Sequence, residues 1–158
     1  MKPFHSLFPE LAQREVRCLH LGPAPDSQPL ATSALPRDEY AYVEFYCEEP
    51  DCDCRRVFLQ VIRKQEPDKV LASIVYGWEK ESFYRKRLRW EQDPDAAARR
   101  VVRGELDPIN EQSQSAEELL ELFQRFVLDE PYRLRLRRHS RLFKEELARV
   151  KADRPSAK

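Results

Sequence analysis

The sequence predicts an α+β protein in which an antiparallel sheet of three or four strands is packed by C-terminal helices. Two patterns lead to this prediction. In the first half, apolar and polar residues alternate, which is typical of half-buried strands. In the second half, apolar residues recur every three or four positions, which is typical of amphipathic helices. A chain of 158 residues can bury a core of its own, so we expect one domain over 1–152 and a disordered tail over 153–158.

Three strands are expected to follow one another as an antiparallel meander. Residues 39–47 alternate between a face that carries Ala41, Val43, Phe45 and Cys47 and a face rich in tyrosine. Residues 56–63 are rich in β-branched and aromatic side chains, and residues 70–78 show a similar preference after a turn. A sheet of this size needs a cover on its hydrophobic face, so the helices that follow are expected to pack there.

The N-terminal part of the chain is less regular. Residues 6–13 are expected to form a short helix. Residues 14–21 fit either the end of that helix or a fourth strand, and we favour the strand. The segment 22–36 contains four prolines, which neither a ladder nor a helix tolerates, so we expect an irregular loop there.

Four helices are expected in the second half of the chain. Residues 80–90 and 96–102 form the first two. Ser115 and Glu118 have the spacing of a capping box and open the third. After Pro131 the last helix carries one apolar stripe, whose members follow at spacings of four, three, four, four and three: Tyr132, Leu136, His139, Phe143, Leu147 and Val150. The stripe places its histidine on the buried face.

Composition excludes several classes of function. The 28 basic and 28 acidic residues give a formal net charge of zero, which argues against a general coat for nucleic acid. Only three glycines occur, and they form neither a P-loop nor a dinucleotide fingerprint. The N-terminal residues lack the apolar core of a signal peptide, and no apolar run approaches about 18 residues, so we expect a cytoplasmic protein without a membrane partner.

Three of the four cysteines lie close together, between two expected strands. Cys47, Cys52 and Cys54 have the spacing Cys-x4-Cys-x-Cys, which a hairpin can gather at its tip. In a reducing compartment such a cluster indicates a metal site rather than disulfides. A redox role has less support, because four acidic residues adjoin the cysteines and disfavour thiolates. The plant-type iron–sulfur spacing is missed by one residue, so we predict a metal-binding β-hairpin with zinc as the cofactor.

A tetrahedral zinc site needs a fourth ligand, which this segment does not supply. His139 is our first candidate, because an imidazole on an apolar helix face needs a partner inside the core. Cys18, His20, His5 and a water molecule are the alternatives. Four protein ligands would make the site structural, whereas three ligands and a water could activate a nucleophile.

Charge is segregated along the chain despite its zero total. Seven acidic residues lie between 38 and 53, whereas eight basic and two acidic residues lie between 133 and 151. The basic helix can simply offset the acidic hairpin within the molecule. Alternatively, Arg133, Arg137, Arg138 and Arg141 form an anion-binding surface for RNA or DNA. A second basic run with aromatic rings would reinforce that surface, through Tyr84, Arg85, Lys86, Arg87, Arg89 and Trp90.

These observations predict a small cytoplasmic zinc-binding protein whose metal is structural and which acts as a binding or adaptor module for a protein partner. A nucleic-acid-associated protein is the second hypothesis. A zinc-dependent hydrolase is the third, since neither a His-Glu-x-x-His motif nor a deaminase signature is present. We therefore favour a protein without enzymatic activity.

Overall fold

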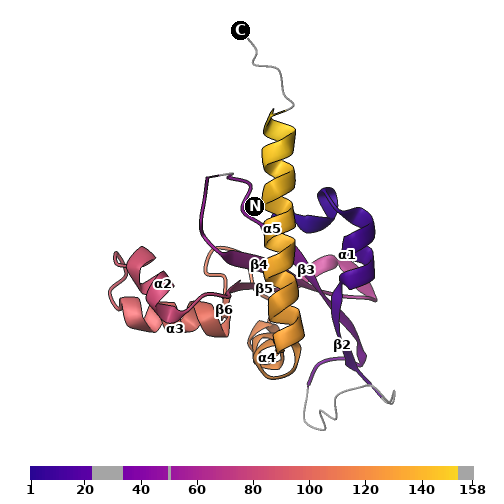
Figure 1. The fold of residues 1–158 in the computed structure, drawn as a ribbon. Coiled ribbons are helices and arrows are strands. Elements are labelled where there is room, and N and C mark those ends of the chain that lie inside the picture. The colour runs from indigo at the N-terminus through magenta and orange to yellow at the C-terminus, as the bar shows by residue number, and fades with distance from the viewer. Residues whose placement is uncertain (23–33, 50, 153–158) are drawn as a thin grey trace.

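The computed structural model describes residues 1–22, 34–49 and 51–152. It confirms the α+β class: an antiparallel sheet is flanked by helices from both ends of the chain (Figure 1). The expected tail at 153–158 and most of the loop expected at 22–36 lie outside the described residues. Within the described ranges, no helix is both long and apolar enough to span a membrane.

The sheet has more strands than predicted. Its strands are β1 (Lys2–Pro3), β2 (Arg17–Leu21), β3 (Asp38–Tyr46), β4 (Arg56–Arg63), β5 (Glu66–Gly77) and β6 (Glu105–Leu106). They follow the order β1-β3-β4-β5-β6, and β2 also pairs with β3. The meander β3–β4–β5 is therefore confirmed, as is β2 as a fourth strand, and the short strands β1 and β6 extend its two sides.

Strand β5 begins earlier than the sequence indicates. Arg63 pairs with Glu66 and Ile62 pairs with Val70, so the ladder shifts its register between these pairs. Pro67 lies in the shifted segment, where a missing backbone N–H removes no regular ladder bond. The expected turn is therefore present but confined to residues 64–65, and the residues after it form a bulged start of the strand.

The tyrosine face of β3 is the core face of the sheet. Tyr40, Tyr42 and Tyr46 are at most 1% exposed, whereas the residues that alternate with them are half-buried. The tyrosine face also carries Glu44, a buried carboxylate. The helices α4 (Ala116–Leu122) and α5 (Glu130–Ala152) pack over this face, as their buried side chains show. These tyrosines are therefore packing residues and offer no open surface for stacking.

The remaining helices are η1 (Phe4–Ser6), α1 (Pro9–Glu15), α2 (Glu81–Arg87), α3 (Pro94–Arg103) and the π-helical segment η2 (Phe123–Val127). Helix α3 is capped by Asp93, whose carboxylate accepts a hydrogen bond from the Ala96 N–H at 2.9 Å. The predicted capping box at Ser115 is wrong, because this side chain makes no cap hydrogen bond. Its ψ of 0° departs from the extended backbone that an N-cap usually needs.

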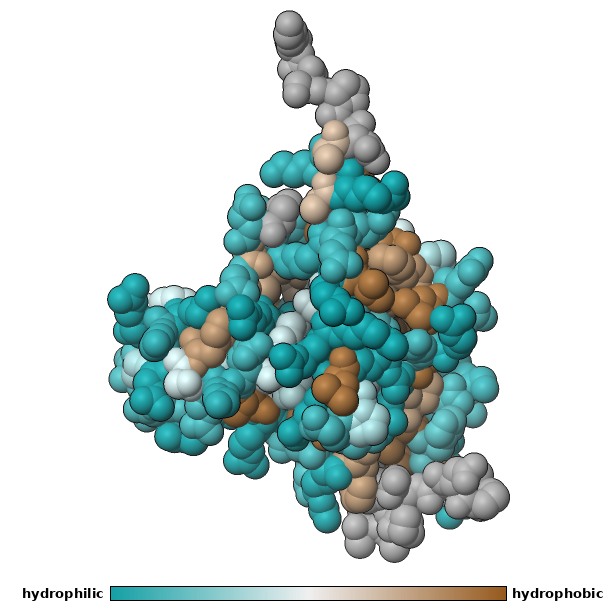
Figure 2. All heavy atoms as spheres, in the orientation of Figure 1, coloured by the Kyte–Doolittle hydropathy of each residue, from teal (hydrophilic) through white to brown (hydrophobic). Residues whose placement is uncertain are grey.

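Helices α2 and α3 form a small lobe beside the sheet, which we call the α2–α3 lobe (Figure 1). The lobe has its own hydrophobic cluster, made by Tyr84, Leu88, Ala97, Ala98 and Val101. Gly77 allows it to approach the sheet, because a Cβ at this position would lie 2.5 Å from the Tyr84 ring. On the face shown in Figure 2 the lobe is mostly hydrophilic, whereas hydrophobic residues gather between α5 and α1.

Candidate metal centre

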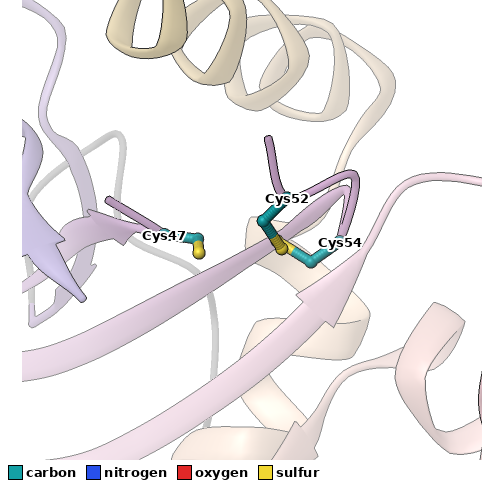
Figure 3. A group of neighbouring side chains, drawn as sticks. All are labelled: Cys47, Cys52 and Cys54. Atoms are coloured by element: carbon teal, nitrogen blue, oxygen red, sulfur yellow. The ribbon is translucent and has the colours of Figure 1, made fainter. Parts of the chain in front are cut away.

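The loop between β3 and β4 brings the three clustered cysteines together. Cys47 follows the end of β3, and Cys52 and Cys54 precede β4. The strands pair Phe45 with Phe58, so the chain folds back and returns beside Cys47. The three Sγ atoms lie within 4.8 Å of one another and approach each other from two sides of the loop (Figure 3).

The spacing of the sulfur atoms is close to what a metal ion requires. A Zn–S bond of about 2.3 Å in a tetrahedron places two sulfurs about 3.8 Å apart. The observed limit of 4.8 Å therefore exceeds the ideal edge by about 1 Å, which side-chain rotation can close. All three cysteines are half-buried and free of disulfides. Of the histidine, cysteine and acidic side chains in the described ranges, no other joins this group.

Helix α5 holds the cysteine loop in place. The Lys144 Nζ donates to the carbonyl oxygen of Glu49 at 2.6 Å and to that of Cys52 at 2.8 Å. The Cys52 N–H in turn donates to the Glu49 carbonyl at 3.1 Å. One ammonium group therefore contacts carbonyl oxygens at both ends of the turn that carries Cys52.

The α2–α3 lobe holds the other side of the loop. The Tyr84 hydroxyl donates to the carbonyl oxygen of Arg55 at 2.6 Å and accepts from the Glu79 N–H at 3.2 Å. Burial raises the pKa of Tyr84 to about 12, so this hydroxyl keeps its proton at neutral pH. Arg55 has a φ of 48°, a left-handed conformation that turns the chain into β4. The loop thus depends on contacts with both α2 and α5.

The carboxylate of Asp53 is already taken up by two guanidinium groups. Arg55 contacts it at 2.6 Å and Arg87 of α2 at 3.0 Å. With Arg56 and Lys144, these side chains place four cations around the cysteines. Three thiolates on a divalent ion carry a net charge of −1, and these cations offset both that charge and the acidic residues Glu48, Glu49 and Asp51 of the loop.

The structure does not bring His139 to the three sulfur atoms. Its ring is 1% exposed and lies between two carboxylates, with Nδ1 2.7 Å from Glu44 and Nε2 3.1 Å from Glu15. The ring stacks on Phe4 at a centroid distance of 4.2 Å. Each ring nitrogen therefore lies within hydrogen-bonding distance of a carboxylate, and the Arg138 guanidinium also lies 3.4 Å from Nε2. His139 thus links α5 to β3 and α1.

The charges around Glu15 stabilise its ionised form. Partial burial opposes ionisation, but the hydrogen bond from His139 and the charges of Arg138 and Arg135 hold the pKa of Glu15 below its ordinary value. Arg138 forms an ion pair with this carboxylate. The Tyr46 hydroxyl lies 2.8 Å from the buried carboxylate of Glu44 on the other side of the ring.

The other proposed fourth ligands also lie elsewhere. Cys18 pairs with Ala41 in the sheet, six residues along β3 from Cys47, which corresponds to about 20 Å. Burial and the neighbouring Glu39 raise the pKa of Cys18 to about 11, so its thiol stays protonated. His20 lies 3.4 Å from the same glutamate. His5 is exposed in η1, outside the cysteine group.

The four arginines predicted to bind anions divide into two sets. Arg133, Arg137 and Arg141 are exposed and follow one another at four-residue spacing, so they share one face of α5. Arg137 lies 4.0 Å from Glu79, and Arg141 lies 3.8 Å from a glutamate on its own helix. Arg138 instead pairs with Glu15 across the helix interface with α1.

Sequence reasoning missed the residues that brace the site. Lys144 and Tyr84 contact the cysteine loop from positions far along the chain, and no local pattern distinguishes them from ordinary helix residues. For the partner of His139, the sequence does contain a signal. Glu44 is a single acid among the tyrosines of its strand face. An acid on a buried face needs a partner, and His139 was the histidine expected on the facing helix.

Fold and site together define a small α+β protein with a three-cysteine centre that can hold a metal ion. The chain matches no model of a known protein family, no curated protein and no solved structure.

Proposed function

We propose that Cys47, Cys52 and Cys54 bind zinc and that the metal is structural, in a cytoplasmic protein that acts as a binding module. The observation that carries this proposal is the convergence of three half-buried sulfur atoms within 4.8 Å, in a loop braced from two sides. Zinc is the preferred ion because a thiolate set with no requirement for redox chemistry suits it, and cytoplasmic cysteines stay reduced.

A binding role accounts for the site better than hydrolysis does. A zinc hydrolase needs a base beside the metal-bound water. The carboxylate of Asp53 is held by Arg55 and Arg87, and the three thiolates reduce the positive charge that zinc offers to a water molecule. The fourth position is assigned to solvent, and the metal fixes the shape of the loop rather than attacking a substrate.

Metal analysis tests the proposal. Protein purified without added zinc is expected to contain one zinc per chain, and Cys52→Ser is expected to lose it. Cys18→Ser is the matched control, because this cysteine lies about 20 Å away along the sheet and should leave the zinc content unchanged. His139→Ala is expected to retain zinc as well, since its ring lies between two carboxylates.

Substitution with cobalt supplies a second measurement. Cobalt bound by three thiolates gives charge-transfer absorption that is lost in Cys52→Ser and kept in His139→Ala. Absence of stoichiometric metal from the wild type, together with no cobalt uptake by the reduced protein, would overturn the proposal. Loss of metal in His139→Ala with the fold intact would return that residue to the ligand set.

A further inference from the structure

A cavity of about 320 Å³ lies between the cysteine loop and the α2–α3 lobe. Its volume falls in the range of small-ligand sites. Its lining includes two of the proposed metal ligands together with basic and aromatic side chains: Cys52, Cys54, Arg56, Tyr84, Arg87 and Trp90. The metal loop is therefore one wall of a pocket whose other wall is the lobe.

Trp90 stands open at this pocket. Its side chain is 73% exposed, although tryptophan is on average highly buried in folded proteins. It makes no ring contact or cation–π contact with the described part of the chain. The neighbouring Phe83, by contrast, is covered by the guanidinium groups of Arg87 at 3.6 Å and Arg55 at 4.8 Å. An indole with a free face is the kind of surface on which nucleic-acid bases stack.

The pocket lies in a basic region of an otherwise neutral protein. Residues 80–103, which span the lobe, include eight basic and four acidic side chains. Among the residues that the structure describes, Arg56, Lys86 and Arg89 form no ion pair. Arg87 contacts Asp53 through one nitrogen and keeps other N–H groups free. Cations without local partners are available to an incoming anion.

The basic region continues onto α5. Arg55, at the end of the cysteine loop, lies 3.2 Å from Glu79, and Arg137 lies 4.0 Å from the same carboxylate. One acidic residue therefore sits between two basic ones, and Arg133 and Arg141 extend the row along the helix. The pocket and the arginine row form one surface that can follow a chain of phosphates.

We infer that this surface binds single-stranded nucleic acid, with a base stacked on Trp90 and phosphates contacted by Arg56 and Arg87, which both line the pocket. A single strand is required because only an unstacked base can reach an indole face. An acidic peptide would match the arginines but would leave the indole unused. The inference rests on the proposed binding function and names the class of ligand for it.

Fluorescence anisotropy with labelled oligothymidylate tests the inference, on protein whose zinc content is measured in the same preparation. Trp90→Ala is expected to weaken binding about tenfold or more. Arg56→Gln is expected to reduce the slope of log affinity against log salt by about 0.7, the value for one phosphate contact on a single strand.

Two substitutions elsewhere serve as controls. Ile109→Ala removes another exposed hydrophobic side chain, which is 88% exposed in the segment before α4, and should not change binding. Lys69→Gln removes one exposed charge beside Val70, which is at the opposite end of the β4–β5 ladder from Arg56, and should keep the full salt slope.

Three results would overturn the inference: no binding of the oligonucleotide by zinc-loaded protein, equal affinity in Trp90→Ala, or equal competition by polyglutamate. The last result would identify an acidic peptide as the ligand. Because the zinc content is measured in the same preparation, a failure to bind the oligonucleotide is distinguished from a failure to bind zinc. Oligonucleotide binding that depends on Trp90 supports the pocket whether or not the preparation contains zinc, and the metal proposal is decided by the metal analysis alone.

Discussion

Replacing Glu44 with leucine is expected to destabilise the protein strongly. The substitution removes the carboxylate that lies 2.7 Å from His139 Nδ1 and leaves this buried ring nitrogen without its partner. The Tyr46 hydroxyl also loses this acceptor, but it keeps the carbonyl of Leu136 at 3.2 Å. The main cost therefore falls on the imidazole ring of His139.

The size of the effect follows from burial. Glu44 is 7% exposed and His139 is 1% exposed, so water cannot replace the missing partner. Removing one member of a buried ion pair costs about 3–5 kcal/mol of unfolding free energy. In a chain of this length each kcal/mol lowers Tm by about 2–4 °C, so the expected loss is about 6–20 °C.

A double-mutant cycle isolates the pair. Replacing both Glu44 and His139 by leucine removes both buried charges, and such replacements are often neutral or stabilising. The double variant is therefore expected to be more stable than either single variant, as measured by urea denaturation at pH 7. If its loss equals the sum of the two single losses, the two side chains are not coupled and the stabilising contact between Glu44 and His139 is refuted.

Three further predictions concern other contacts. Glu15→Gln should destabilise the protein above the ordinary glutamate pKa of 4.5, and its difference from wild type should vanish as pH falls through the lowered folded-state pKa, followed by urea denaturation across pH 2–7. Gly77→Ala should cost about 1–3 kcal/mol in the same assay through overpacking against the α2–α3 lobe. Gly22→Ala, with open space around its Cβ, should cost less. Lys144→Met should weaken zinc binding about 10- to 100-fold in a chelator competition, and an effect no larger than that of Lys151→Met would refute the bracing role.

The sequence predicted those features whose determinants lie within one segment. The alternation in 39–47 gave both the strand and its two faces, and the stripe after Pro131 correctly predicted that His139 is buried. The three cysteines lie close together in the chain, so a single hairpin brings them together. Each of these outcomes depends on backbone period or short loop closure, which local composition controls.

The features that were not predicted depend on contacts between distant segments. His139 and Glu44 are 95 residues apart, and Lys144 and Cys52 are 92 residues apart. The apolar stripe required a partner for the histidine but did not specify whether it would be a metal or a carboxylate. The answer depends on which residues of α5 face the cysteine loop: Lys144 contacts that loop, whereas His139 contacts two carboxylates, and this is a property of the assembled fold.

The hydroxyl of Tyr84 connects the α2–α3 lobe to the cysteine loop. The free energy of local unfolding is expected to be lower for the lobe than for the central sheet. The α2–α3 lobe has a cluster of only five buried residues, so its amide protons should exchange through partial openings before those of the central strands. The Tyr84 hydroxyl donates a hydrogen bond to the carbonyl of Arg55, one residue after Cys54. Every partial opening of the lobe therefore releases one side of the cysteine loop. A ligand held by the sulfur atoms would therefore slow hydrogen exchange in a helix pair that contributes no sulfur to the site.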